Sequence, residues 1–186
     1  MQALALRRNS MKSAVLVIDV QSALFDPEPK PFESDIVVKK INKVTHWARN
    51  NSLPVIFIQH EQLNSILEFE CDGWQLQSGL ELEVTDIKVR KTTPDSFLNT
   101  ELKVVLNAHQ IEHLIICGYA SEFCIDTTVR RAAGLGYSIE LVSDAHTTHD
   151  KPHASGNEIR MHHNCTLPNI SSFGVKITAT PTDALI

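Results

Sequence analysis

Three side chains with complementary chemistry lie at the ends of separate apolar segments. Asp19 follows the run SAVLVI, Lys91 closes the alternating segment DIKVRK, and Cys124 follows the run HLIICGY. A thiol can attack a carbonyl, a carboxylate can take up and return a proton, and an ammonium can balance both charges. Ligands of an open parallel sheet collect at the carboxyl ends of its strands, so we expect these residues to meet at one edge.

The segment GYASEFC predicts how the thiol is activated. We expect Ser121 to cap a helix that runs to about Ala133, which puts Cys124 in the first turn, at the positive end of the helix dipole. That position and a nearby ammonium predict a thiolate, favoured over the ordinary thiol pKa of about 8.5. The backbone N–H groups of Ala120 and Cys124 are candidates for an oxyanion hole. We expect Asp19 to take the thiol proton and later protonate a leaving amine.

Alternating strands and helices must position these residues. Apolar runs and apolar stripes predict strands at 13–20, 54–60, 86–91, 113–119, 137–142 and 173–180, and helices at 34–51, 98–109, 121–133 and 153–166. This order predicts a single α/β domain over residues 13–186, in which helices cover both faces of a six-stranded parallel sheet in a Rossmann-like, three-layer α/β/α arrangement. Residues 1–12 are expected to be a tail, with Met11 an alternative start. Residues 61–85 lack a period and predict a long loop near the pocket.

Composition excludes several classes of partner. The chain has 186 residues, a net charge of −5 and no dense run of Lys and Arg, so we expect neither nucleic acid nor an anionic membrane as a partner. A small-molecule substrate fits better. No secretory signal or membrane-spanning stretch is evident, and the four cysteines show no paired spacing. Reduced thiols in the cytoplasm are therefore expected.

Nine histidines raise the question of a metal site. Two sets could be drawn as ligands, namely His149 with His153, and His162 and His163 with Cys165. Surface or capping histidines explain both sets more simply, so we expect no metal site. No G-x-G-x-x-G segment follows the first strand, which argues against a dinucleotide-binding domain. We expect no cofactor.

Three segments together resemble a known family. IDVQSALF, VRKTTPDSF and GYASEFCIDTTVRRAAGLGYSIELVSDA are similar to the signature segments of the isochorismatase-like cysteine hydrolases, over about residues 13–178. The resemblance implies a six-stranded parallel sheet flanked by helices and a catalytic triad of Asp19, Lys91 and Cys124. It also implies a homodimer or homotetramer.

The resemblance extends to the surroundings of the nucleophile. It implies a cis peptide bond between Tyr119 and Ala120. The positions that resemble the pocket lining of the family are Gln21, Phe25, His60, Trp74 and Tyr119. Two of these have an equally good structural interpretation, because Trp74 could anchor the long loop and Phe25 could belong to the core.

The chain departs from parts of the family, and these departures bear on function. Nicotinamidases of the family carry an Asp-x-His metal motif after the second strand, whereas Gln59 and His60 stand here. Well-known isochorismatases lack the cysteine, so Cys124 favours hydrolysis of a C–N bond through a covalent thioester. A vinyl-ether hydrolase is one alternative. A non-catalytic binding or scaffold protein is another, although the presence of all three triad residues argues against it.

Overall fold

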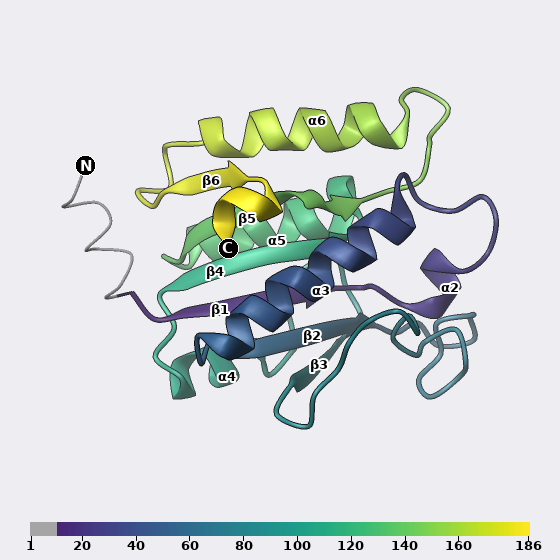
Figure 1. Ribbon diagram of the computed structural model, residues 1–186, viewed down its shortest axis with the longest axis horizontal. Helices are drawn as coiled ribbons and strands as arrows, with labels where there is room; N and C mark the ends of the chain where they lie inside the picture. The colour runs from purple at the N-terminus through teal and green to yellow at the C-terminus, as the bar shows by residue number, and fades with distance from the viewer. Residues whose placement is uncertain (1–10) are drawn as a thin grey trace.

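Six parallel strands make up the centre of the computed structural model, which describes residues 11–186 (Figure 1). From edge to edge their order is β3-β2-β1-β4-β5-β6. The strands are β1 (Ser13–Ile18), β2 (Val55–His60), β3 (Ile87–Lys91), β4 (His113–Tyr119), β5 (Ser138–Thr147) and β6 (Ile177–Thr180). The expectation of a single α/β domain with a six-stranded parallel sheet is confirmed. The predicted tail at residues 1–12 lies almost entirely outside the described residues.

Helices cover both faces of the sheet, and the central strand shows why. In β1, Leu16 packs in one buried cluster with helices α4 (Leu102–Ala108) and α5 (Asp126–Gly134). Its neighbours Val15 and Val17 pack in a second cluster with α3 (Ser34–Asn50). Side chains of a strand alternate between faces, so a strand covered on both sides must be apolar throughout. This explains the continuous apolar run of β1 and produces three layers (Figure 1).

Several elements begin later than the apolar pattern predicts, because local turns intervene. Leu98 is 45% exposed and lies in a turn, so the predicted helix over 98–109 is shortened to α4. Ser155 forms a capping box with Glu158, so the helix predicted from 153 begins at Gly156 as α6 (Gly156–Thr166). Gly174 adopts a φ of 77°, and the turn there delays the strand predicted from 173 until β6.

Three short elements were not predicted from the sequence. They are α2 (Ser22–Phe25), the 3-10 helix η2 (Leu167–Asn169) and α7 (Thr182–Leu185). An element of three or four residues completes at most one turn, so no repeating apolar stripe can reveal it. The strand predicted at 137–142 also continues further, to Thr147. That extension becomes important for the nucleophile.

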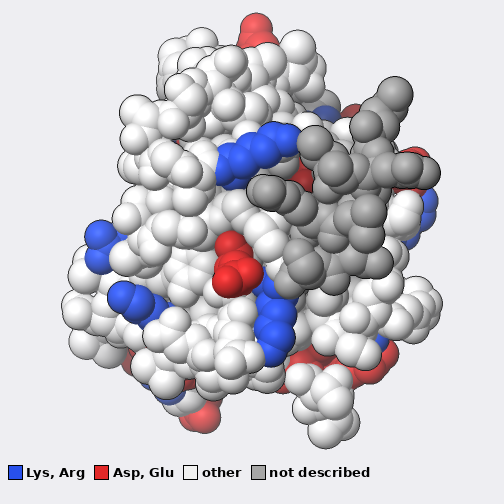
Figure 2. Space-filling model, turned by 90° about the vertical axis from the view of Figure 1, so that its left-hand side faces the viewer, with Lys and Arg blue, Asp and Glu red and all other residues white. Residues whose placement is uncertain are grey.

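Charged side chains of both signs lie at the end of the molecule where the strands begin. Figure 2 shows Lys and Arg side chains there, separated by acidic and neutral residues and without a continuous basic patch among the coloured residues. Within residues 11–186, no helix combines the length and apolar character needed to cross a bilayer.

Gly118 lets strands β1 and β4 come together where the reactive residues leave the sheet. It has a φ of 120°, and a Cβ added there would lie 2.1 Å from the carbonyl oxygen of Ile18. Ile18 and Gly118 are partners in the parallel ladder, directly before Asp19 and Tyr119. Only glycine combines this φ with so close an approach of two backbones.

We predict that Gly118→Ala lowers the free energy of unfolding by about 3 kcal/mol or more, because the new methyl group meets backbone that cannot move aside. Gly136→Ala is the matched control, since Gly136 also has a positive φ, of 95°, but has no atom within 4 Å of its added Cβ. That control is expected to cost only about 1 kcal/mol, from backbone strain alone. Chemical denaturation measures both, and equal costs would contradict the role of close approach.

Candidate active site

Asp19, Lys91 and Cys124 meet at the carboxyl ends of the strands. Asp19 directly follows β1, Lys91 is the last residue of β3, and Cys124 lies in the turn after β4. The ammonium of Lys91 donates to Asp19 Oδ2 at 2.7 Å and to Cys124 Sγ at 3.2 Å. Asp19 and Lys91 are each 2% exposed. The three residues that the sequence predicted as a triad are therefore in direct contact.

The Lys91 ammonium is surrounded by acceptors. Besides Asp19 and Cys124, the Thr93 carbonyl oxygen lies 3.1 Å and His60 Nδ1 lies 3.3 Å from its Nζ, so three N–H groups are shared among four acceptors. A buried charge is tolerated when it is paired and hydrogen-bonded in this way. Burial and the charge of Lys91 lower the pKa of His60, so its ring is neutral and accepts from the ammonium. His60, which was expected to bind substrate, thus also supports Lys91.

Asp19 is held by its backbone and leaves one carboxylate oxygen unused. Its φ is 53°, and its N–H donates to the carbonyl oxygen of Ile58 at 2.8 Å. Its own carbonyl oxygen accepts from the backbone N–H of Gln21 at 3.0 Å. Oδ1 is buried and has no hydrogen-bond partner among residues 11–186. A fixed carboxylate with a free lone pair is suited to accept a proton from a neighbouring group.

The expectation of a resting thiolate at Cys124 is wrong. Burial, followed by the negative charge of Asp19, raises the pKa of this thiol to about 12, and the opposing effect of Lys91 is smaller. One ammonium already neutralises the Asp19 carboxylate, so a thiolate would add a second, uncompensated negative charge to a buried site. The thiol therefore holds its proton until a reaction removes it.

The turn that carries Cys124 differs from the predicted helix start. Residues Ser121–Ile125 form a single wide π turn, η1, and regular α-helix begins only at Asp126. The prediction that Ser121 caps this helix is wrong. Its Oγ instead hydrogen-bonds His146 Nδ1 at 2.8 Å. The Tyr119–Ala120 peptide bond is cis, and the Ala120 carbonyl oxygen accepts from the N–H of Ile125 at 3.1 Å. The oxyanion role of the Ala120 and Cys124 N–H groups stays a prediction.

Gln21 has a structural position that the sequence did not reveal. The side chain is fully buried, and its Nε2 donates to the carbonyl oxygens of Trp74 at 2.8 Å and of His60 at 2.9 Å. Its Oε1 accepts from the N–H of His60 at 2.8 Å. Both amide donors are therefore used by backbone, and Gln21 joins the ends of β1 and β2 to the long loop. Nothing in this arrangement leaves its N–H groups for a substrate.

The aromatic residues expected in the pocket lie in two groups. Phe25 is 2% exposed and packs edge-on against Tyr119, with ring centroids 5.8 Å apart. The Tyr119 hydroxyl hydrogen-bonds His149 Nδ1 at 2.8 Å. Trp74 packs instead against Phe69 within the long loop, and its buried Nε1 has no partner in the described part of the chain. Phe25 thus packs against Tyr119, at the end of β4 before the nucleophile turn, whereas Trp74 packs within the long loop.

A polar group that was not predicted from the sequence lies on the other side of the nucleophile turn. Glu122 Oε1 accepts from Thr148 Oγ1 at 2.9 Å and lies 3.3 Å from Lys151 Nζ. These partners belong to the segment HTTHDK (146–151), which begins four residues after the predicted strand end at residue 142. Their position after a strand was the available signal, but the shortened strand prediction concealed it.

Metal ligation finds no support in the described residues. Gln59 is buried, and its Nε2 donates to the carbonyl oxygen of Trp74 at 3.0 Å. No group of three or more His, Cys, Asp or Glu residues within positions 11–186 is arranged to hold a metal ion. His149 bonds Tyr119, and the rings of His162 and His163 pack edge-on against each other.

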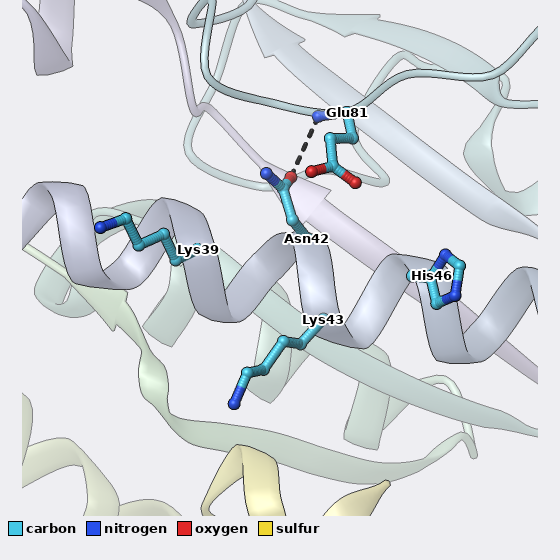
Figure 3. Close-up of a pocket in the computed structure, with 5 residues that line it drawn as sticks. All are labelled: Lys39, Asn42, Lys43, His46 and Glu81. Carbon is cyan, nitrogen blue, oxygen red and sulfur yellow. Dashed lines mark hydrogen bonds between the residues drawn. The ribbon is translucent and has the colours of Figure 1, made fainter.

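A separate surface groove runs along α3 (Figure 3). It has a volume of about 260 Å³ and is lined by Lys39, Asn42, Lys43, His46 and Glu81. Asn42 Oδ1 accepts from the backbone N–H of Glu81, and the two lysine side chains extend along different directions. None of these residues contacts the triad, so the groove is distinct from the site at the strand ends.

Comparison with known proteins gives a consistent result. The model of the isochorismatase domain matches residues 13–170. A streptothricin hydrolase of Streptomyces noursei is 32% identical over 142 residues, covering 76% of this chain but only 51% of that protein. A ureidoacrylate amidohydrolase, RutB of Caulobacter segnis, is 29% identical and is covered to 50%. This chain thus spans about half the length of both relatives.

The fold agrees with a solved structure over nearly the whole chain. A crystal structure of an isochorismatase family protein is 32% identical, with a TM-score of 0.83 that covers 90% of this chain and 97% of that one. The arrangement of sheet and helices is therefore shared along almost the full length of both chains.

We predict that Asp19→Asn raises the rate at which iodoacetamide alkylates Cys124 at pH 7.5 by about tenfold or more, because removing the negative charge lowers the thiol pKa. Lys91→Met is expected to slow the same reaction, since the ammonium favours the thiolate. Mass spectrometry of the peptides gives the rate for each cysteine against pH, and the exposed Cys165 serves as the internal reference.

Circular dichroism controls for unfolding, since breaking the buried Asp19–Lys91 pair is expected to cost about 3–5 kcal/mol of stability. A slower reaction in folded Asp19→Asn would contradict the charge relation between the carboxylate and the thiol.

Proposed function

Because this chain belongs to the isochorismatase family, whose domain model matches residues 13–170, we propose that it is a metal-independent cysteine hydrolase cleaving a C–N bond of a small amide. The observation that carries the proposal is the contact of Lys91 Nζ with both Asp19 and Cys124, beside a carboxylate oxygen without a partner. These groups supply a nucleophile, a base and a balancing charge. The names of the two relatives, a streptothricin hydrolase and a ureidoacrylate amidohydrolase, support hydrolysis as the reaction class.

The first half of the reaction forms a thioester. Asp19 takes the thiol proton of Cys124 as the sulfur attacks the carbonyl carbon, so no free thiolate has to persist in the buried site. The negative charge that develops on the carbonyl oxygen is stabilised by the N–H groups of Ala120 and Cys124. Asp19 then gives its proton to the amide nitrogen, the C–N bond breaks, and the amine leaves.

The second half returns the enzyme to its starting state. Asp19 removes a proton from water, and the resulting hydroxide attacks the thioester carbonyl. The C–S bond breaks, the carboxylic acid leaves, and the sulfur regains the proton held by Asp19. Throughout, the Lys91 ammonium stays between Asp19 and Cys124, so the Asp19 carboxylate and the Cys124 sulfur each have a cation within hydrogen-bond distance.

The raised pKa of Cys124 fits this order of events. A thiol with a pKa of about 12 is almost wholly protonated at neutral pH, so attack must be coupled to proton transfer. We assign this acceptor to the Asp19 carboxylate, whose Oδ1 has no hydrogen-bond partner in the described part of the chain. Neutral Cys124 also keeps the site at zero net charge, which favours an uncharged amide over an anionic substrate.

We predict release of ammonia or amine from at least one member of a panel of nicotinamide-like, ureido and lactam amides. Cys124→Ala is expected to abolish release, and Asp19→Asn to lower kcat by about 10²–10⁴-fold, the usual contribution of a general base. Coupled ammonia assays measure turnover, and intact-mass spectrometry after rapid acid quench detects the acylated Cys124. Cys165→Ala, at an exposed position, is the matched control.

The same assay separates the alternatives. Turnover of isochorismate without amide hydrolysis would favour vinyl-ether chemistry, and amine release that persists in Cys124→Ala would contradict the nucleophile. Absence of both activities would favour a binding protein. Asp19→Asn gives a further internal check. Compared with wild type, its Cys124 is expected to be alkylated faster, while its kcat is expected to be lower.

A further inference from the structure

A chain of hydrogen bonds, buried at Ser121 and His146, connects the nucleophile turn to helix α6. Ser121 Oγ bonds His146 Nδ1 at 2.8 Å, and His146 Nε2 bonds Asn164 Oδ1 at 2.9 Å. Asn164 Nδ2 then donates to the carbonyl oxygen of Ser143 at 2.8 Å. We propose that Ser121, His146 and Asn164 are positioning residues, which hold the turn carrying Cys124 in register with Asp19 and Lys91.

The protons in this chain have only one consistent arrangement. Asn164 Nδ2 donates to a carbonyl oxygen, which identifies the amide oxygen as the group facing His146. That oxygen can only accept, so Nε2 of His146 carries the hydrogen and Nδ1 is the acceptor. The Ser121 hydroxyl must therefore donate to Nδ1. Burial lowers the pKa of His146 to about 4, which keeps the ring neutral and this direction intact near neutral pH.

An irregularity in β5 brings His146 to the turn. Ile116 of β4 pairs with Leu141, but Gly118 pairs with His146, so β5 advances five residues while β4 advances two. The extra residues include Ser143, whose carbonyl oxygen is the one that Asn164 binds. Without this bulge, a residue nearer to Leu141 would lie opposite Gly118. The bulge thus aims the imidazole at the residue that begins the turn.

The turn is held from two sides. On one side, the fully buried Ser121 bonds the fully buried His146 of β5. On the other side, Cys124 contacts Lys91 at the end of β3, an edge strand of the sheet. A π turn, with its i→i+5 hydrogen bonds, is wider and rarer than a regular helical turn. If position 121 required only packing, alanine would fill it and would bury no hydroxyl that needs a hydrogen-bond partner. The hydroxyl therefore acts through its bond.

The position of the turn determines how strongly the charges of Asp19 and Lys91 act on the Cys124 thiol. The pKa of Cys124 responds to Asp19 and Lys91 only while the sulfur stays beside them. A turn released from His146 is expected to move, which weakens the effect of Asp19 on the thiol. The inference relies on the proposed function only in taking Cys124 as the nucleophile and Asp19 as its base.

A double-mutant cycle on the full chain tests this coupling without a known substrate. Asp19→Asn is made in the wild type and in Ser121→Ala, Asn164→Ala and Asn157→Ala, and alkylation of Cys124 by iodoacetamide at pH 7.5 is followed by mass spectrometry. Asn157 is the matched control, because it is an exposed asparagine on the same helix. The rate increase caused by Asp19→Asn is expected to be about tenfold or more in wild type and Asn157→Ala, and below about threefold in the other two.

Each outcome decides the inference. If the Asp19→Asn effect is undiminished in folded Ser121→Ala and Asn164→Ala, while their Tm falls, the hydrogen-bond chain is merely structural and the proposal is overturned. Should Ser121→Ala fail to fold, Asn164→Ala decides alone, because Asn164 is only partly buried and alanine suits a helix. If Asp19→Asn has no effect even in wild type, Asp19 is not the base, and the proposed function falls together with the positioning role.

Discussion

The buried pair of Asp19 and Lys91 is the interaction on which the site depends. Taking two opposite charges out of water costs several kcal/mol for each ion, and only close contact with full hydrogen bonding offsets this cost. The fold provides both conditions, because the ends of β1 and β3 are separated only by β2, whose last residue His60 accepts from the ammonium. Gly118 allows β4 to approach β1 closely enough for the nucleophile turn to join the pair.

Charge balance then determines how the thiol behaves. One cation can neutralise one anion, and in the resting site that anion is the Asp19 carboxylate. Cys124 therefore stays protonated, with its pKa raised by burial and by Asp19. The same arrangement becomes productive when the proton moves to Asp19, because Lys91 then pairs with the sulfur instead. The ammonium thus stabilises each of the two anionic forms in turn, at no change in net charge.

The irregular end of β5 has a comparable role for the turn. His146, near the end of β5, and His149, just after it, bond the hydroxyls of Ser121 and Tyr119, which flank Ala120 on either side. Thr148, between them, bonds Glu122. Three contacts from residues 146–149 therefore hold the residues around the nucleophile. Rigid support of this kind is what a reaction that couples attack to proton transfer requires.

Apolar periodicity and the positions of reactive residues at strand ends were enough to predict the α/β fold and the meeting of Asp19, Lys91 and Cys124, because parallel strands all end at the same edge. Tertiary structure alone decided the protonation of Cys124, since a pKa depends on burial and on the distance between charges from distant segments. It also decided that Ser121 bonds His146 rather than capping a helix, and that Gln21 binds backbone. Hydrogen bonds between residues far apart in sequence leave no periodic pattern, because each depends on the three-dimensional register of two segments.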